Sequence, residues 1–190
     1  MAALDPRTTA LVLIDLQNGI VAMPWAPRSG PDVLAAGKSL ADKFRAAKAP
    51  VVLVRVAFAA DFADAPPSNV DQPLQGPPGG LPPDWSTLAE GLAQPTDIVV
   101  TKRQWGAFTG TDLDVQLRRR GVRTIVLGGI ATNFGVESTA RFAWELGYDV
   151  AIVEDACAGP TAELHEMAFR AIFPRVARVV RSADVSFAKS

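Results

Sequence analysis

Short runs of valine, isoleucine and leucine alternate with segments of helical periodicity along almost the whole chain. The predicted strands are Thr9–Asp15, Pro50–Phe58, Thr96–Lys102, Arg123–Gly129, Tyr148–Asp155 and Val176–Ser182. The predicted helices are Gly30–Ala49, Asp112–Gly121, Phe134–Gly147 and Thr161–Phe173. Near-continuous apolar strands separated by helices are typical of a parallel sheet covered on both faces. The alternation therefore predicts one α/β domain over residues 1–190, without an internal repeat.

One segment, at about residues 59–95, interrupts this alternation and is rich in Pro, Gly, Asp and Ala. Because both flanks belong to the same pattern, we interpret it as a functional loop or partner-binding arm and not as a linker between domains. It carries more apolar anchors than a free linker needs, namely Phe62, Leu74, Leu81 and Trp85. We therefore expect a homo-oligomer, at least a dimer. The alternative is a loop that folds on its own subunit.

The composition excludes several classes of protein. The chain has 190 residues, 19 of them basic and 20 acidic, and this balance gives no case for a nucleic-acid or membrane partner. One Cys and one His make neither an internal disulfide nor a zinc cluster. The sequence shows neither a signal-peptide pattern nor an apolar run near the roughly 20 residues of a membrane span. We expect a cytoplasmic protein that needs no cofactor.

Polar side chains stand where several predicted strands end. The first strand ends at Asp15, with Gln17 just after it, the third at Lys102, and the fifth at Glu154 and Asp155. Ligands of open parallel sheets bind beyond the carboxyl ends of the strands. Strands lie about 4.8 Å apart, so a lysine can reach a carboxylate one or two strands away. Each residue alone could be a turn former or a solvated strand end. Charges that close buried strands are costly unless paired, which favours one shared site.

The fourth predicted strand runs into a turn and a helix, in the stretch "GGIATNFGVESTAR" (128–141). We expect this turn to line the same site. Its predicted substrate-binding residues are Ile130, Ala131, Thr132, Asn133 and Phe134, together with Gln17 after the first strand. Two aromatic residues after the third strand, Trp105 and Phe108, are candidates for the pocket wall, with ordinary loop-to-core packing as an equal alternative.

Three motifs in order, "LVLIDLQNG", "VVTKRQWGAF" with the 128–141 stretch, and "YDVAIVEDACAGP", resemble the isochorismatase-like hydrolases, or cysteine hydrolase superfamily. The resemblance covers nearly the whole chain. It implies a doubly wound parallel sheet in the order 3-2-1-4-5-6 and a non-proline cis peptide bond between Ile130 and Ala131. It also implies a catalytic Asp and Lys at Asp15 and Lys102, and places the family's catalytic Cys at Gly135.

Two other residues do not replace that thiol. Cys157 follows the fifth strand, one strand away, and is expected to be small, buried and inert. His165, the only histidine, is expected to be structural or on the surface. Nicotinamidase-like relatives bind metal through an Asp/His cluster after the second strand. The matching stretch here has Asp61 and Asp64 but no His, so we expect no catalytic metal.

Three hypotheses for function remain open. In the first, Asp15 protonates the vinyl carbon of an enol ether and Lys102 binds an anion or tunes the protonation of Asp15. True isochorismatases, which this chain resembles in lacking the Cys, cleave such a bond. In the second, the protein is a weakly active or inactive family member that binds a small molecule or a protein. In the third, it is an amidase that uses another nucleophile or an activated water.

Overall fold

Six parallel strands form one sheet in the order β3-β2-β1-β4-β5-β6, as predicted. The structure is a computed structural model that describes residues 3–67, 69–73 and 80–188. The strands are β1 (Thr9–Ile14), β2 (Val51–Val56), β3 (Ile98–Lys102), β4 (Thr124–Ile130), β5 (Asp149–Ala158) and β6 (Arg178–Val180). The order reverses between β1 and β4, so the carboxyl ends of these strands flank the crevice where such sheets bind ligands.

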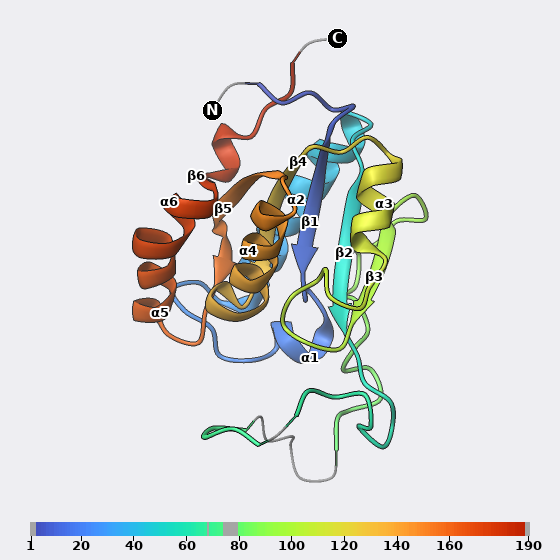
Figure 1. Ribbon diagram of the computed structural model, residues 1–190, viewed down its shortest axis with the longest axis vertical. Helices are drawn as coiled ribbons and strands as arrows, with labels where there is room; N and C mark the ends of the chain where they lie inside the picture. The colour runs from blue at the N-terminus through green and yellow to red at the C-terminus, as the bar shows by residue number, and fades with distance from the viewer. Residues whose placement is uncertain (1–2, 68, 74–79, 189–190) are drawn as a thin grey trace.

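Helices cover both faces of the sheet and make three layers (Figure 1). The long helix α2 (Gly30–Ala46) lies on one face, and α3 (Leu113–Arg119), α4 (Glu137–Glu145) and α6 (Phe173–Val176) lie on the other. Two short helices, α1 (Asn18–Val21) and α5 (Ala162–Met167), complete the set. Ser29 begins α2 with a reciprocal capping box to Asp32, which satisfies two N–H groups that the first turn leaves free.

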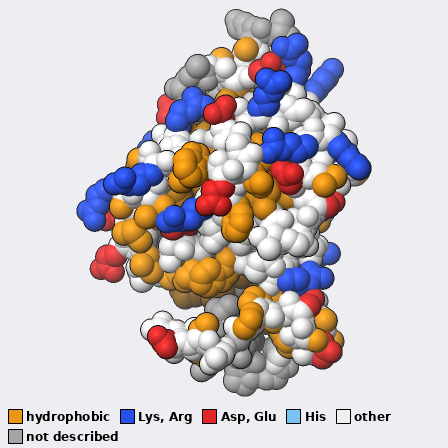
Figure 2. Space-filling view, viewed as in Figure 1, with side chains coloured by type: hydrophobic (Ala, Val, Ile, Leu, Met, Phe, Trp, Pro, Cys, Tyr) orange, Lys and Arg blue, Asp and Glu red, His pale blue; other side chains and the backbone are white. Residues whose placement is uncertain are grey.

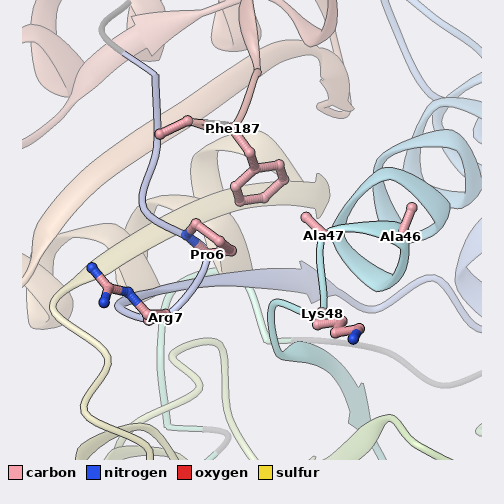
Figure 3. A pocket seen from close by; sticks show the side chains of 7 residues that line it. Pro6, Arg7, Ala46, Ala47, Lys48 and Phe187 are labelled. Atoms are coloured by element: carbon pink, nitrogen blue, oxygen red, sulfur yellow. The ribbon is translucent and has the colours of Figure 1, made fainter. Parts of the chain in front are cut away.

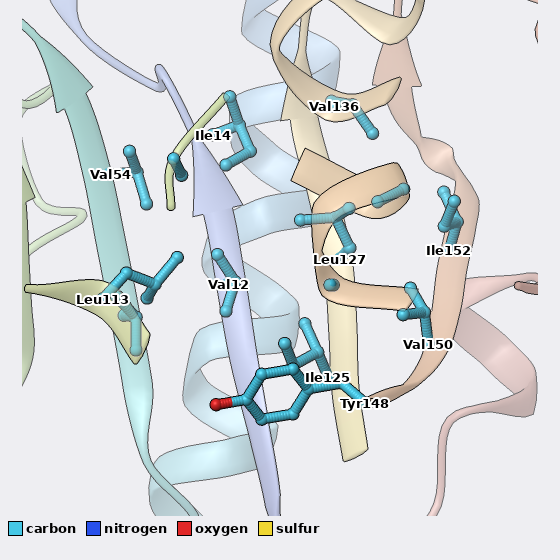
Figure 4. Packing of buried hydrophobic residues seen from close by; sticks show 14 of the residues in the cluster. Val12, Ile14, Val54, Leu113, Ile125, Leu127, Val136, Tyr148, Val150 and Ile152 are labelled. Carbon is cyan, nitrogen blue, oxygen red and sulfur yellow. The ribbon is translucent and has the colours of Figure 1, made fainter. Parts of the chain in front are cut away.

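The hydrophobic core consists of two clusters, one on each side of the sheet. Along β1, Val12 and Ile14 point into the cluster under α3 and α4, shown in Figure 4. Leu11 and Leu13 point into the cluster under α2. All four side chains are at most 1% exposed, so β1 is buried on both faces, as its unbroken apolar run predicts.

Three predicted elements differ from the structure. The fifth strand continues to Ala158 because its pairing with β4 shifts between Leu127 and Gly129, which places residues 153–156 of β5 opposite Gly128 in a bulge. Glu154 and Asp155 therefore lie inside β5 and not at its end. The predicted helix after β4 begins instead as a π-helical turn, Thr132–Val136, that leads into α4. A second π-helical turn, Ala168–Ile172, divides the last predicted helix.

The Pro-rich segment has two parts with different surroundings. Residues 59–67 and 69–73 project from the body beyond the carboxyl ends of the strands (Figures 1 and 2). The later part folds onto its own subunit, where the Trp85 carbonyl accepts bonds from Gly19 N and Gln17 Nε2. Phe62 is 43% exposed on the arm, and Leu74 lies outside the described residues. No helix among the described residues is long and apolar enough to cross a membrane.

A groove of about 430 Å³ lies at the opposite, amino edge of the sheet (Figure 3). Pro6, Arg7, Lys48 and Phe187 are among its lining residues. Arg7 is already paired with Asp5 at 2.9 Å. The groove is therefore separate from the strand ends that carry the polar residues of the predicted site.

Candidate active site

A buried ion pair joins the ends of β1 and β3. The Lys102 ammonium donates to Oδ2 of Asp15 at 2.7 Å and to the Gln104 carbonyl at 3.0 Å. Lys102 is 2% exposed and Asp15 is 6% exposed. The pair spans β2, which lies between the two strands. The structure thus brings together the two charged strand ends that the sequence predicted to share one site.

Asp15 is held in a setting that favours its neutral form. Burial raises its pKa to about 6, against the opposing effect of the Lys102 charge and hydrogen bond. Its second oxygen, Oδ1, is buried and has no hydrogen-bond partner among the described residues. Buried carboxyl oxygens are normally hydrogen-bonded. Asp15 therefore has one carboxyl oxygen that no donor occupies within the described parts of the chain.

Gly135 lies directly against this carboxyl group. A Cβ atom built on Gly135 would lie 3.4 Å from Oδ2 of Asp15, 3.4 Å from the Trp105 carbonyl oxygen and 2.9 Å from Cγ2 of Ile14. The φ of Gly135 is outside the left-handed region. Close packing against Ile14, and not backbone conformation, is therefore what limits a side chain at this position.

The turn between β4 and α4 carries the other predicted residues. The peptide bond between Ile130 and Ala131 is cis. The backbone N–H groups of Phe134 and Val136 both donate to the Ala131 carbonyl at 3.1 Å. Oδ1 of Asn133 is buried and, within the described parts of the chain, unpartnered. The turn thus carries Gly135, which adjoins Asp15, while the Asn133 amide oxygen lies beside Gly159.

Two of the predicted pocket residues have other roles. Gln17 is fully buried, and its amide nitrogen donates to the carbonyls of Val56 (3.0 Å) and Trp85 (3.1 Å) while its oxygen accepts from Val56 N (2.8 Å). It therefore fastens the Pro-rich segment to β2 and has no N–H left for a substrate. Phe108, 7% exposed, packs on Tyr148 in the hydrophobic core. We replace both predictions with structural roles.

The remaining aromatic residues lie at the surface beside Gly135. The rings of Trp105 and Phe134 are 4.7 Å apart between centroids, and Trp105 is 49% exposed. Ile130 and Ala131, in contrast, are 0% and 7% exposed and pack in the cluster under α2. Trp105 and Phe134 are thus the aromatic side chains of the predicted set that can contact a molecule from outside.

Glu154 and Asp155, which the sequence places at the end of the fifth strand, do not join the Asp15–Lys102 pair. Because the bulge in β5 redirects them, Asp155 accepts bonds from Ser182, and Glu154 pairs with Arg28 and Arg181, each at 2.8 Å. No local pattern in the sequence signals this second polar cluster, since its members come from separate loops and strands.

His165 belongs to that second cluster. It is 2% exposed, with Nδ1 2.9 Å from Oγ1 of Thr132 and Nε2 3.5 Å from Oε1 of Glu154. Thr132 is itself fully buried, so its hydroxyl faces the histidine and not the solvent. The predicted substrate contact of Thr132 is replaced by this internal bond.

The single thiol takes no part in the site. Cys157 is buried, and burial raises the pKa of its thiol to about 12. Asp64 pairs with Arg103 and accepts from Ala59 N, so it ties the base of the arm to the end of β3. Over the described ranges, no group of three or more His, Cys, Asp or Glu residues is placed to hold a metal ion.

Comparison with known proteins identifies the family of this chain. The isochorismatase domain model matches residues 9–184. An isochorismatase family protein of Escherichia coli O157:H7, YecD, is 52% identical over 180 residues, which are 94% of this chain and 95% of YecD. The structure of an isochorismatase family protein from Burkholderia thailandensis superposes with a TM-score of 0.91 at 53% identity, covering 96% of this chain and 95% of the other.

A more distant relative carries a named activity. The ureidoacrylate amidohydrolase RutB of Variovorax paradoxus is 33% identical over 178 residues, covering 81% of this chain and 70% of RutB. The family match spans nearly all of the sheet, from β1 to the turn after β6, and includes both ends of the Asp15–Lys102 pair. The chain belongs to the isochorismatase family of hydrolases.

Proposed function

We propose that this protein hydrolyses a small molecule by acid–base chemistry of Asp15 and Lys102, without a cysteine nucleophile. The observation that carries the proposal is the free Oδ1 of Asp15, a buried carboxyl with a pKa of about 6, next to a glycine. We assign Gly135 the position where cysteine-dependent members of the superfamily hold their thiol. A covalent thiolate mechanism then has no nucleophile at this corner.

Hydrolysis of an enol ether fits these groups. Asp15 gives its proton to the terminal vinyl carbon, and the electron pair of the double bond forms the new C–H bond. The ether oxygen shares the positive charge as an oxocarbenium ion. Water adds to the cationic carbon and returns a proton to the Asp15 carboxylate. The resulting hemiketal then separates into a carbonyl compound and an alcohol, so the enzyme ends in its starting protonation state.

Lys102 and the turn complete the proposed site. Lys102 keeps its bond to Oδ2 of Asp15, which leaves Oδ1 to carry the transferred proton. Trp105 and Phe134 offer an apolar wall, and the Asn133 amide oxygen offers an acceptor for a substrate N–H or O–H. We propose these three residues, and not Gln17 or Phe108, as the substrate contacts.

A second candidate is hydrolysis of an amide by a water molecule that ionised Asp15 activates. The relative named as a ureidoacrylate amidohydrolase favours it. Here Asp15 acts as a base and not as an acid, so the active form is the carboxylate. The two candidates use the same pair of residues and require opposite protonation states of Asp15.

A turnover screen of enol ethers against amides tests the proposal, with wild-type protein beside Asp15→Asn. We expect one substrate class to turn over and Asp15→Asn to lose about 10²–10⁴-fold in kcat, the usual contribution of a general acid or base. Asp155→Asn is the matched control, because Asp155 is a carboxylate on β5 that binds Ser182. Binding without turnover in either class would instead identify a binding module, and a trapped acyl-enzyme would reject non-covalent catalysis.

A further inference from the structure

A chain of polar side chains runs from the surface at Arg181 to the buried His165 and Thr132 beside the turn, and its hydrogen bonds have one direction. Arg28 and Arg181 donate to Glu154, so this carboxylate acts as an acceptor. Burial lowers the pKa of His165, which keeps its ring neutral. The ring nitrogen that faces Glu154, Nε2, must then carry the single N–H proton, at a separation of 3.5 Å. Nδ1 is left as an acceptor.

The hydroxyl of Thr132 must therefore donate to Nδ1 of His165, at 2.9 Å. Thr132 is the first residue of the π-helical turn and follows Ala131, whose carbonyl accepts the N–H groups of Phe134 and Val136. The contact joins α5, which carries His165, to the turn that follows β4. The bond thus holds the first residue of the π-helical turn that contains Gly135.

We propose that His165 is a positioning residue that holds the 131–136 turn against Asp15 by accepting a hydrogen bond from Thr132. The proposal rests on the proposed function only in that this turn is part of the site. His165 touches no reacting atom in it. Glu154, held by Arg28 and Arg181, determines which ring nitrogen of His165 carries the proton. The other ring nitrogen then binds the Thr132 hydroxyl and holds the turn in place. A neutral histidine is suited to this role because it can accept at one end while donating at the other.

The chain has one histidine, so the ring nitrogen signals of labelled protein are unambiguous. Long-range ¹⁵N–¹H spectra at pH 7 should show a neutral ring protonated at Nε2. A ring protonated at Nδ1, or at both nitrogens, would reverse the Thr132 bond and overturn the proposal. This measurement needs no substrate.

Two substitutions at the same position separate positioning from simple stability. The side-chain oxygen of His165→Asn lies near the place of Nδ1 and can accept from Thr132. The amide of His165→Gln reaches towards Glu154 and leaves the Thr132 hydroxyl unmatched. Hydrogen exchange at the Phe134 and Val136 amides reports the turn, and the Leu11 amide in β1 reports the body of the protein. We expect turn exchange in His165→Gln to rise about fivefold or more relative to Leu11, the worth of one hydrogen bond.

His165→Asn should restore turn exchange to within about twofold of wild type, on the same scale of one hydrogen bond. Equal exchange ratios in the Asn and Gln variants would overturn the proposal. If His165→Gln does not fold, Thr132→Val and Thr132→Ser provide the same comparison with the histidine intact. Valine should loosen the turn and serine should restore it, and no difference between them would overturn the proposal.

Turnover gives the functional half of the test. With a substrate from the screen, His165→Gln should lower kcat about fivefold or more, with KM within about twofold of wild type, and His165→Asn should recover most of it. If the turn amides exchange faster in His165→Gln but neither wild type nor any variant turns over a substrate, the positioning role stands and the proposed function is rejected. If turnover depends on Asp15 but exchange at the turn is unchanged in His165→Gln, the proposed function stands and the positioning role is rejected.

Discussion

The Lys102 ammonium lies 2.7 Å from Oδ2 of Asp15, although the two residues are 87 positions apart and a whole strand separates β1 from β3. Both groups are almost completely buried, so neither can be hydrated as it would be at the surface. Ion pairs in such a setting are costly to break and contribute little net stability. Their value is chemical, because the same burial brings the pKa of Asp15 to about 6.

The pH dependence of turnover should distinguish the two candidate reactions. As the pH rises through about 6, Asp15 loses its proton. If Asp15 is the acid that protonates an enol ether, kcat falls with rising pH above that value. If Asp15 is the base that activates water, kcat rises through the same range and then levels off. Rates from about pH 5 to pH 8 decide between them, and a profile flat across this range would contradict both.

Lys102→Met should destabilise the protein more at high pH than at low pH. Lys102 opposes the burial effect on Asp15, so its loss raises the Asp15 pKa above 6. A carboxyl whose folded-state pKa is raised adds stability below its unfolded pKa, and this is lost as the pH rises through the folded value. Unpaired buried charges cost about 3–5 kcal/mol, so we expect a loss of that size at about pH 8 and a smaller one at about pH 5.

Denaturant unfolding of Lys102→Met at both pH values measures this difference. The double variant Asp15→Asn/Lys102→Met is the control, since it has no carboxyl at this site to ionise. The decrease in its free energy of unfolding, relative to wild type, should be nearly independent of pH. A Lys102→Met protein that is equally destabilised at the low and the high pH would show that Asp15 does not titrate in this range.

Gly135→Cys should create a reactive thiol. Its Cβ would lie 3.4 Å from Oδ2 of Asp15, and the Ile14 methyl group at 2.9 Å must move slightly to admit it. The nearby Lys102 charge favours the thiolate, whereas burial raises the Cys157 pKa to about 12. We expect iodoacetamide to modify the introduced thiol much faster than Cys157. Wild-type protein, with Cys157 alone, gives the background rate.

Gly135→Ala controls for packing, because it adds the same Cβ without sulfur. If Gly135→Cys folds as well as Gly135→Ala but its new thiol reacts no faster than Cys157, the corner is not a vacated thiol site. The assignment of Gly135 to the family's nucleophile position would then fail, and with it the argument that a missing thiol sets this chain apart from the cysteine-dependent members.

Gln17→Leu should release the Pro-rich segment. The substitution removes the bonds of the Gln17 amide to the N–H and C=O of Val56, and it leaves the Trp85 carbonyl with Gly19 N as its remaining donor. Buried groups left unsatisfied cost about 1–3 kcal/mol each. We expect a lower melting temperature and faster proteolysis in the stretch around Trp85. Gln104→Leu is a control in a neighbouring loop. Unchanged proteolysis in Gln17→Leu would contradict the inference that the Gln17 hydrogen bonds hold the segment around Trp85 to β2.

The arm should join two or more copies of the chain. Residues 59–67 and 69–73 project from the body, and Phe62 and Val70 on them are 43% and 58% exposed. Apolar groups on a projecting segment favour burial in a partner. Sedimentation at micromolar concentration should give at least a dimer, and Phe62→Asp together with Val70→Asp should shift it towards monomer. A monomeric wild-type protein would contradict the prediction.

The sequence predicts most of the fold because unbroken apolar strands and helical spacing fix the layers locally. It also locates Asp15 and Lys102, since each closes an apolar run and parallel strands end at one edge. The family resemblance adds the strand order and the position of Gly135. These features depend on residues close together in the sequence, or on a rule that holds for every parallel sheet.

The sequence does not show which way a side chain points inside a loop or a bulge. Gln17 turns to the backbone of β2, and Phe108 turns to Tyr148, because distant segments supply their partners. Glu154 leaves the strand end because β5 shifts its register against β4, and that shift depends on two strands at once. The bond between His165 and Thr132 likewise forms between separate helical segments. Each of these depends on tertiary contacts that no local pattern records.

The backbone of Asp15 has a φ of 53°, in the left-handed region that glycine, asparagine and aspartate tolerate best. This narrows the set of informative replacements at the site. Asparagine and glycine preserve the chain path while removing the acid, whereas alanine, glutamate or valine would add backbone strain to the loss of chemistry. Replacements at position 15 therefore fall into two groups, one that removes only the acid and one that also disturbs the fold. Asp15 thus carries the proposed reactive group, and its backbone also adopts the left-handed conformation through which the chain leaves β1.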